Sequence, residues 1–270
     1  MTIAMLINGE VPADLTRALP ANDRGFHYGD GVFETALLQE GAVRHLDAHL
    51  ERLYRGCETL RIQAPPRQVL VDEIARVSAN LRSSVLKIVI SRGVGERGYR
   101  PGAGAPTRIV ATYPAPEHNP PRGLRVRWCR TRLGRNASLA GIKHLNRLEQ
   151  VLAQAEWSDG AIAEGLMLDT EGELVSATAS NVFIVRDGVL LTPDLRFCGV
   201  RGVMREQVLR AASELGIATS EEPLWPSDVE AAEEVFLTNA VRGIRSVASL
   251  ATLEWEHTRI ADRLRAALGA

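Results

Sequence analysis

The chain has 270 residues, of which 45% are hydrophobic and 24% charged, as in ordinary globular proteins with a packed core. Its 32 basic and 33 acidic residues give a formal net charge of −1, so neither nucleic acid nor an anionic membrane is expected as the main partner. The three cysteines have neither disulfide-framework nor zinc-ligand spacing. With no signal-peptide pattern and no membrane-span pattern, we expect a cytoplasmic protein.

The first half of the chain alternates between strand and helix patterns. The predicted elements are a strand at 5–7 followed by the hairpin pair Asn8-Gly9, a strand at 32–38, helices at 47–60 and 66–81, and strands at 85–91 and 108–113. The first of these helices rests on the spacing of Leu50, Leu53, Cys57 and Leu60, and Asp47 is its expected N-cap.

Four prolines between 114 and 123, without apolar periodicity, predict an interdomain linker. We therefore expect one domain at 1–114, a linker at 115–123 and a second domain at 124–270. The second half should contain strands at 124–130, 166–168, 182–185, 189–191 and 235–237, with Asp187-Gly188 as a hairpin turn, and helices at 144–157, 202–215 and 257–268. Mixed strands, scattered helices and hairpins in both halves indicate an α+β fold.

The helix expected at 144–157 should bury Leu145, Leu148, Val151, Leu152 and Ala155, which recur at helical spacing. A G-x-G-x-x-G pattern occurs at 93–98, but no helix pattern follows it, so this loop is not interpreted as a dinucleotide-binding motif.

Several residues are candidates for chemistry. Lys143 falls between a glycine-containing loop and the predicted helix, where a buried lysine can become a nucleophilic amine, although most lysines are exposed. The segment 199–204 precedes a helix and offers free N–H groups to a phosphate, although an ordinary turn has the same pattern. Arg52 is a second phosphate candidate or a surface residue. His45 and His49, four residues apart, are a weak metal pair because a third ligand is not evident.

Four segments together resemble the fold-type IV pyridoxal-phosphate family, also called class IV aminotransferases. They are Tyr28-Gly29-Asp30-Gly31-Val32-Phe33-Glu34-Thr35, Ala48-His49-Leu50-Glu51-Arg52-Leu53, the Lys143 segment, and 199–205 followed by Thr238-Asn239-Ala240. Within this family, Ile142-Lys143-His144-Leu145-Asn146-Arg147 and Ser91-Arg92-Gly93 with Arg97-Gly98-Tyr99 resemble the aminodeoxychorismate lyase branch. The resemblance implies a small N-terminal α/β domain, a larger C-terminal mixed β-barrel-like domain with flanking helices, and a homodimer.

The resemblance also implies a role for each matching residue. Lys143 would bind pyridoxal 5'-phosphate as an aldimine and act as the catalytic base, and Thr35 would place a hydroxyl near the reacting carbon. The residues that would hold the cofactor are Arg52, Ser176, the N–H groups of Val203 and Met204, and Asn239. Arg97 and His27 would face the substrate, with Arg97 opposite a carboxylate across the dimer interface.

One position departs from the family pattern. Ser176 stands where relatives carry a glutamate that pairs with the pyridine nitrogen of the cofactor. A hydroxyl supplies no full counter-charge, so the ring should withdraw electrons less strongly. Transamination depends on that withdrawal, whereas an elimination that forms an aromatic ring depends on it less.

The expected reaction converts 4-amino-4-deoxychorismate, a dicarboxylate, into 4-aminobenzoate and pyruvate, a step of folate biosynthesis. Lys143 would remove the proton from the carbon that bears the amino group, and pyruvate would leave from the neighbouring carbon. One alternative is a D-amino-acid or branched-chain aminotransferase of the same fold. Another is a non-catalytic relative that binds a phosphorylated ligand or a partner protein.

Overall fold

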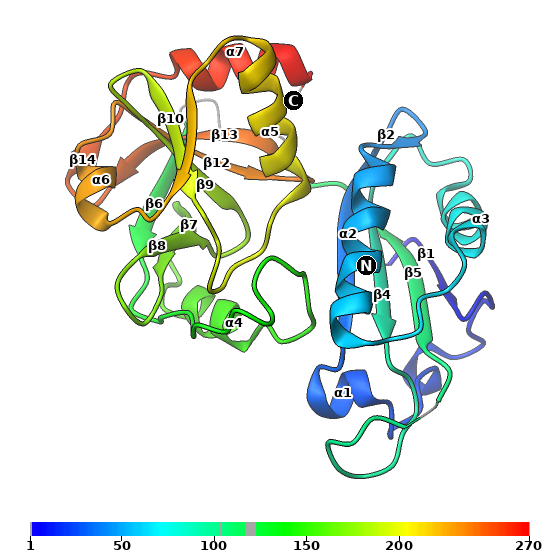
Figure 1. Ribbon diagram of the computed structural model, residues 1–270. Coiled ribbons are helices and arrows are strands. Elements are labelled where there is room, and N and C mark those ends of the chain that lie inside the picture. Colours follow the sequence, from blue (N-terminus) through cyan, green and yellow to red (C-terminus); the bar gives the residue numbers. More distant parts are fainter. Residues whose placement is uncertain (1, 103, 117–122, 270) are drawn as a thin grey trace. The chain divides into compact units, whose positions relative to one another are not determined.

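The computed structural model describes residues 2–102, 104–116 and 123–269. The chain divides into two compact units, each with its own sheet and hydrophobic core (Figure 1). The first unit comprises Met1–Pro116 and Ile142–Asn146, and the second comprises Glu117–Gly141 and Arg147–Ala270. Contacts thus group the short segment around Lys143 with the first unit, whereas the sequence-based boundary placed it in the second domain. Residues 117–122 of the proposed linker lie outside the described residues.

The first unit contains a five-stranded antiparallel sheet in the order β1-β5-β4-β2-β3. Its strands are β1 (Ala4–Ile7), β2 (Gly31–Gln39), β3 (Ala42–Val43), β4 (Ser83–Ser91) and β5 (Thr107–Tyr113). Its helices are η1 (Leu15–Arg17), α1 (Arg24–Tyr28), α2 (Leu46–Leu60) and α3 (Arg67–Ser78). The four strands and two long helices predicted for this half are confirmed.

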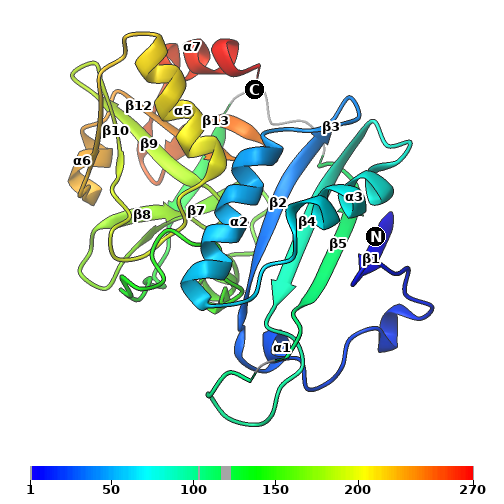
Figure 2. The same cartoon turned by 45° about the vertical axis from the view of Figure 1, so that its right-hand side comes forward.

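Strand alternation divides this sheet into two different faces. Val32 and Ala36 of β2 are buried against the apolar sides of α2 and α3, which lie together on one face of the sheet (Figure 2). The side chains between them, Phe33 and Thr35, are only partly buried and lie on the opposite face. The second face is therefore the one available for chemistry.

The start of α2 corrects one prediction. Asp47 is not the N-cap, because the helix begins at Leu46 and its N-cap residue is His45, with a left-handed φ of 52°. The backbone N–H of Arg44 still bonds to the carbonyl of Leu37 (2.9 Å), so the β2–β3 hairpin reaches residue 44 and the chain turns abruptly at His45. The Asp47 side chain pairs instead with an arginine of α3.

The second unit contains a mixed sheet in the order β11-β10-β9-β12-β13-β6-β7-β8, with β14 beside β13. Its strands are β6 (Leu124–Trp128), β7 (Ile162–Leu168), β8 (Leu174–Ala177), β9 (Asn181–Arg186), β10 (Val189–Pro193), β11 (Thr219–Glu222), β12 (Glu234–Asn239), β13 (Gly243–Leu250) and β14 (Leu253–Glu254). Its helices are α4 (Leu148–Gln154), α5 (Val203–Glu214), α6 (Pro226–Glu230) and α7 (Arg259–Leu268). The predicted β9–β10 hairpin is confirmed, and its turn residues Asp187 and Gly188 both have positive φ.

The second sheet is buried on both sides. One side carries an aliphatic core that includes Leu166, Val182 and Leu237. On the other side, Phe183 and Phe236 stack with ring centroids 5.1 Å apart and pack against residues of α5 and α7. The sheet therefore fixes the position of the N-terminus of α5, where the sequence predicts a phosphate site.

The helix expected at 144–157 is wrong in its bounds and in its buried face. It forms only as α4, and Leu148, Val151 and Leu152 are 76%, 60% and 60% exposed, while Ala153 is buried. The preceding residues cannot start a helix because they bond to β2 as extended chain. None of the helices within the described ranges is long and apolar enough to cross a membrane.

Candidate active site

Lys143 lies in an extended strap, residues 142–146, that runs along the edge of β2 in the first unit. The N–H of Phe33 donates to the carbonyl of Lys143 (2.9 Å), and the N–H of Leu145 donates to the carbonyl of Gly31 (2.9 Å). Two backbone hydrogen bonds to the β2 edge therefore fix the position of the Lys143 backbone.

The Lys143 amine lies 4.3 Å from the centre of the Phe33 ring. A second amine, that of Lys87 in β4, lies 5.6 Å from the same ring centre. Thr35 pairs with Lys87 across the two strands and shares a face with Phe33. The structure thus groups two predicted catalytic residues, Lys143 and Thr35, on one face of the first sheet.

Sequence reasoning missed Lys87. The signal was present, because a lysine interrupts the strand 85–91 whose neighbours Leu86, Ile88 and Ile90 are all buried. Such a residue lies at an alternate position, on the face that carries Phe33.

Arg52 lies on α2, where it makes a two-pronged contact with the buried carboxylate of Glu34. Its Nε and Nη2 donate to the two carboxylate oxygens at 2.7 and 2.6 Å, and His49 Nδ1 lies 2.7 Å from the same carboxylate. Burial alone would raise the pKa of Glu34, but Arg52 and the His49 hydrogen bond outweigh it and lower that pKa to about 2. Glu34 is on the helix-covered face, so Arg52 is held on the side of β2 opposite Phe33 and Thr35.

The arginine-bearing loop is anchored by Arg24 and Tyr28 of α1. Arg24 Nη1 donates to the carbonyl of Gly98 (2.8 Å), and the N–H of Gly98 donates to the Tyr28 hydroxyl (3.0 Å). The Arg24 guanidinium also lies 4.7 Å from the Tyr28 ring centre. Arg97, directly before Gly98, is exposed on a loop whose backbone is held in place. His27 is exposed too, and its Nε2 lies 2.7 Å from a backbone carbonyl of the same unit.

In the second unit, α5 begins with features that suit an anion. Its N-cap is Gly202, without a side-chain cap, so the first N–H groups, those of Val203 and Met204, have no capping partner. A Cβ at Gly202 would lie 2.0 Å from Asn181 Oδ1, so only glycine allows this close packing. The hydroxyl of Thr238 is buried and has no hydrogen-bond partner within the described part of the chain.

Thr238 lies two residues after Phe236 on β12, and Phe236 packs against α5. Strand alternation therefore puts the Thr238 hydroxyl on the side of the sheet that carries α5. A buried hydroxyl without a partner is costly, and a phosphate oxygen would satisfy it.

Asn239 is held by a buried polar network. Its Nδ2 donates to Ser180 Oγ (3.0 Å), which also accepts from Arg245 Nη2 (3.0 Å) and donates to Glu164 Oε1 (2.6 Å). Arg245 and Glu164 are themselves ion-paired. The Asn239 Oδ1 accepts two backbone N–H groups of the following turn. This geometry leaves one Nδ2–H of Asn239 for an outside ligand.

Ser176 lies on β8, opposite Met167 of β7, and is partly buried. The acidic residue closest before it, Glu173, forms an ion pair with Arg135 at 3.0 Å. Glu173 is therefore already paired and is not available to supply the negative charge that Ser176 lacks.

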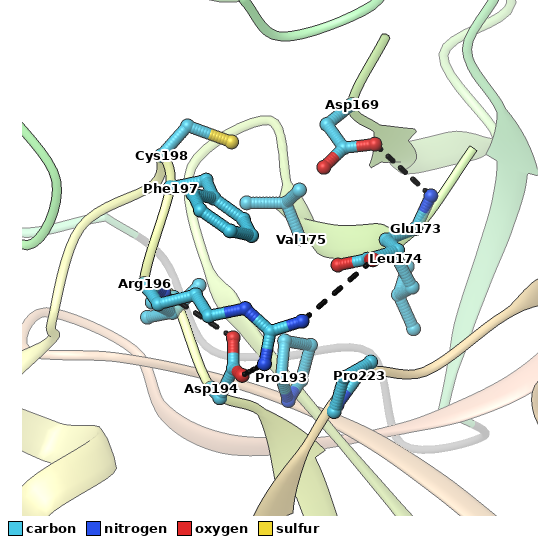
Figure 3. Close-up of a pocket in the computed structure, with 11 residues that line it drawn as sticks. Asp169, Glu173, Leu174, Val175, Pro193, Asp194, Arg196, Phe197, Cys198 and Pro223 are labelled. Atoms are coloured by element: carbon cyan, nitrogen blue, oxygen red, sulfur yellow. Dashed lines mark hydrogen bonds and ion pairs between the residues drawn. The ribbon is translucent and has the colours of Figure 1, made fainter. Parts of the chain in front are cut away.

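A separate pocket of about 250 Å³, including space open to solvent, lies in the second unit (Figure 3). It is lined by Val175 and Phe197, and its charged groups pair with one another, as Arg196 does with Asp194 (2.7 Å). None of the predicted site residues lines it. No group of three potential metal ligands occurs in the described segments, and the His45–His49 pair therefore gains no third ligand there.

The predicted site residues are distributed over both units. Those in the first unit are His27, Thr35, Arg52, Arg97 and Lys143, and those in the second are Ser176, Val203, Met204 and Asn239.

Known proteins are similar to this chain over most of its length. The sequence profile described as "Amino-transferase class IV" matches residues 31–250. An aminodeoxychorismate lyase from Vibrio harveyi is 35% identical over 240 residues, covering 87% of this chain and 89% of that protein.

Solved structures give the same result. The crystal structure of 4-amino-4-deoxychorismate lyase from Pseudomonas aeruginosa is 43% identical and has a TM-score of 0.89, with 97% of this chain and 98% of that chain covered. The branched-chain amino acid aminotransferase of Escherichia coli is 24% identical, with a TM-score of 0.87 and 100% and 94% coverage, and it supports the fold alone. The predicted α+β, fold-type IV architecture is confirmed, and the chain belongs to the class IV aminotransferase family.

Proposed function

We propose that this protein is a pyridoxal-phosphate-dependent lyase that converts 4-amino-4-deoxychorismate into 4-aminobenzoate and pyruvate. The observation that carries the proposal is the Lys143 amine, which the strap holds over Phe33 on the same sheet face as Thr35. The similarity to aminodeoxychorismate lyases from two organisms, at 35% and 43% identity, supports this activity.

The residues present fit a phosphate-bearing cofactor. The uncapped start of α5 and the buried hydroxyl of Thr238, which has no partner among the described residues, both suit phosphate oxygens. In the proposal, the N–H groups of Val203 and Met204, with Asn239 and Arg52, would hold the phosphate, and Lys143 would hold the cofactor at its carbonyl end. When bound, pyridoxal phosphate would supply electron withdrawal from the substrate carbon that carries the nitrogen.

The protein's own groups then perform the proton transfers. The Lys143 amine accepts the proton from that carbon, and Thr35 contributes a hydroxyl on the same face. Arg97 and His27 contact the substrate. Arg97 comes from a second copy of the chain and binds a substrate carboxylate. Ser176 would face the ring nitrogen of the cofactor with a hydroxyl and no full counter-charge, which would favour an aromatising elimination over transamination.

The test combines spectroscopy with product analysis. Purified protein with pyridoxal phosphate should absorb visible light, and addition of 4-amino-4-deoxychorismate should change that spectrum and release pyruvate. The Lys143→Ala variant is the control, and addition of the substrate should neither change its spectrum in that way nor release pyruvate. Steady turnover of D- or branched-chain amino acids with 2-oxoglutarate, without pyruvate release from the chorismate derivative, would identify an aminotransferase instead. No visible absorbance with added cofactor would favour a non-catalytic binding protein.

A further inference from the structure

Lysine is almost absent from this chain. Of its 32 basic residues only two are lysines, Lys87 and Lys143, and the other 30 are arginines. Both lysine amines lie over the same aromatic ring, that of Phe33. The two lysine amines of the chain thus lie beside the same Phe33 ring, and every other basic residue in the count is an arginine.

Packing does not explain this choice. The other cation–π contacts of the described chain, on Tyr28, Trp157 and Phe197, all use arginine. Arginine stacks on aromatic rings at least as well as lysine. The property that lysine has and arginine lacks is the ability to give up a proton near neutral pH.

Among the described residues, Lys87 has no counter-ion. Its side chain is partly buried in the middle of β4, and its amine makes no hydrogen bond or ion pair with any residue that the structure describes. The distances of the two amines from the ring centre of Phe33 limit their separation to no more than about 10 Å. A substrate the size of one six-membered ring with a three-carbon side group can contact both amines.

We propose that Lys87 is a second catalytic lysine, which binds the carboxylate of the departing three-carbon group and donates a proton to its oxygen. This inference rests on the proposed lyase function. Lys143 accepts the proton from the carbon bearing nitrogen, the electrons of that C–H bond form the ring double bond, and the neighbouring C–O bond breaks with its electrons going to oxygen. Lys87 donates its proton to that oxygen, giving the enol of pyruvate, which becomes the ketone. Proton return from Lys143 to Lys87 through solvent restores both amines, so no further reactant is required.

Two substitutions separate binding from proton donation. Lys87→Arg keeps the positive charge and cannot donate a proton, so kcat should fall by about 100-fold or more while KM changes little. Lys87→Met removes both properties, so kcat should fall and KM should rise. Arg196→Met, which removes a cation from the ring of Phe197, is the matched control and should leave both constants near those of the wild type.

Substrate binding gives a second readout that does not depend on turnover. Calorimetric titration of 4-amino-4-deoxychorismate into inactive Lys143→Ala protein measures affinity alone. The single variant Lys143→Ala and the double variant Lys143→Ala with Lys87→Arg should bind with similar affinities, because both keep a cation at the second position. Adding Lys87→Met to Lys143→Ala should weaken binding about 10-fold. Ethylamine should restore part of the activity of Lys87→Ala by supplying the missing ammonium group.

The outcomes decide between the two proposals. If Lys87→Arg keeps the wild-type kcat, or if it is inactive and ethylamine does not rescue Lys87→Ala, the inference is overturned while the lyase function stands. If Lys87→Arg fails to fold, the amine rescue alone decides. If the wild-type protein releases no pyruvate, the lyase function fails, and the role of Lys87 fails with it.

Discussion

The Glu34 carboxylate allows a quantitative test of how the first unit holds Arg52. Its pKa falls from 4.5 to about 2 in the folded chain, where it is bonded to Arg52 and His49. A shift of that size corresponds to about 3 kcal/mol of stability at neutral pH. Replacing Glu34 by Gln removes the carboxylate that pairs with the buried Arg52, and breaking a buried ion pair in this way usually costs about 3–5 kcal/mol. The pKa shift and the usual cost of breaking a buried ion pair both predict that Glu34→Gln loses about 3 kcal/mol of stability or more.

The stability that Glu34 contributes should change with pH in one direction only. Because the folded pKa is lowered, the contribution of Glu34 is fully present above the unfolded value of 4.5 and is lost as pH falls through about 2. Urea unfolding of wild type and Glu34→Gln should therefore differ by about 3 kcal/mol at pH 7 and by roughly half of that at pH 3. Glu51→Gln, at an exposed position of the same helix, is the control and should stay within about 0.5 kcal/mol. A difference between wild type and Glu34→Gln that is small at pH 7, or that stays constant down to pH 3, would refute the reasoning.

The second unit and the thiols allow three further tests. Gly202→Ala should force Asn181 aside, lower stability by about 1–3 kcal/mol in urea unfolding and weaken pyridoxal phosphate binding; unchanged affinity would contradict the phosphate role of this helix start. Ser180→Ala should free the Asn239 amide and lower cofactor affinity, whereas Ser180→Ala added to Asn239→Ala should have no further effect on that affinity. Burial raises the pKa of Cys57 to about 12 and that of Cys129 to about 11, so a disulfide reagent at pH 8 should label these two thiols only after denaturation, and their rapid labelling in the folded protein would contradict this burial.

Periodicity was sufficient where one face of an element is uniformly apolar. β2 and β4 alternate regularly, and α5 follows its glycine-rich start, so all three were predicted close to their observed bounds. β13 was missed because Arg245 and Ser246 interrupt its apolar pattern. Both have partners far along the chain, Glu164 and a residue of α7, which no local pattern shows.

The errors around Lys143 have one physical cause. Residues 144–147 have helical spacing in the sequence, yet the backbone of β2 bonds to residues 143 and 145, so the chain there is not helical. Hydrogen bonds to β2 thus outweighed the local preference of this segment for a helix. The helix that does form, α4, is shorter, and its apolar positions are exposed. The motif around Lys143 was recognised from its residues alone, but the neighbouring cation, Lys87, required the register of β2 and β4.

The strap also has a consequence for how the chain becomes a folded protein. The first unit is not a continuous stretch, because the piece that completes the edge of β2 is synthesised only after β6, the first strand of the second unit. Until that piece emerges, the N–H of Phe33 and the carbonyl of Gly31 remain open on a strand edge, and such edges promote association between chains. A fragment that ends at Pro116 should therefore aggregate rather than behave as an independent domain. The residue proposed to carry the chemistry belongs to the segment that makes the first unit complete.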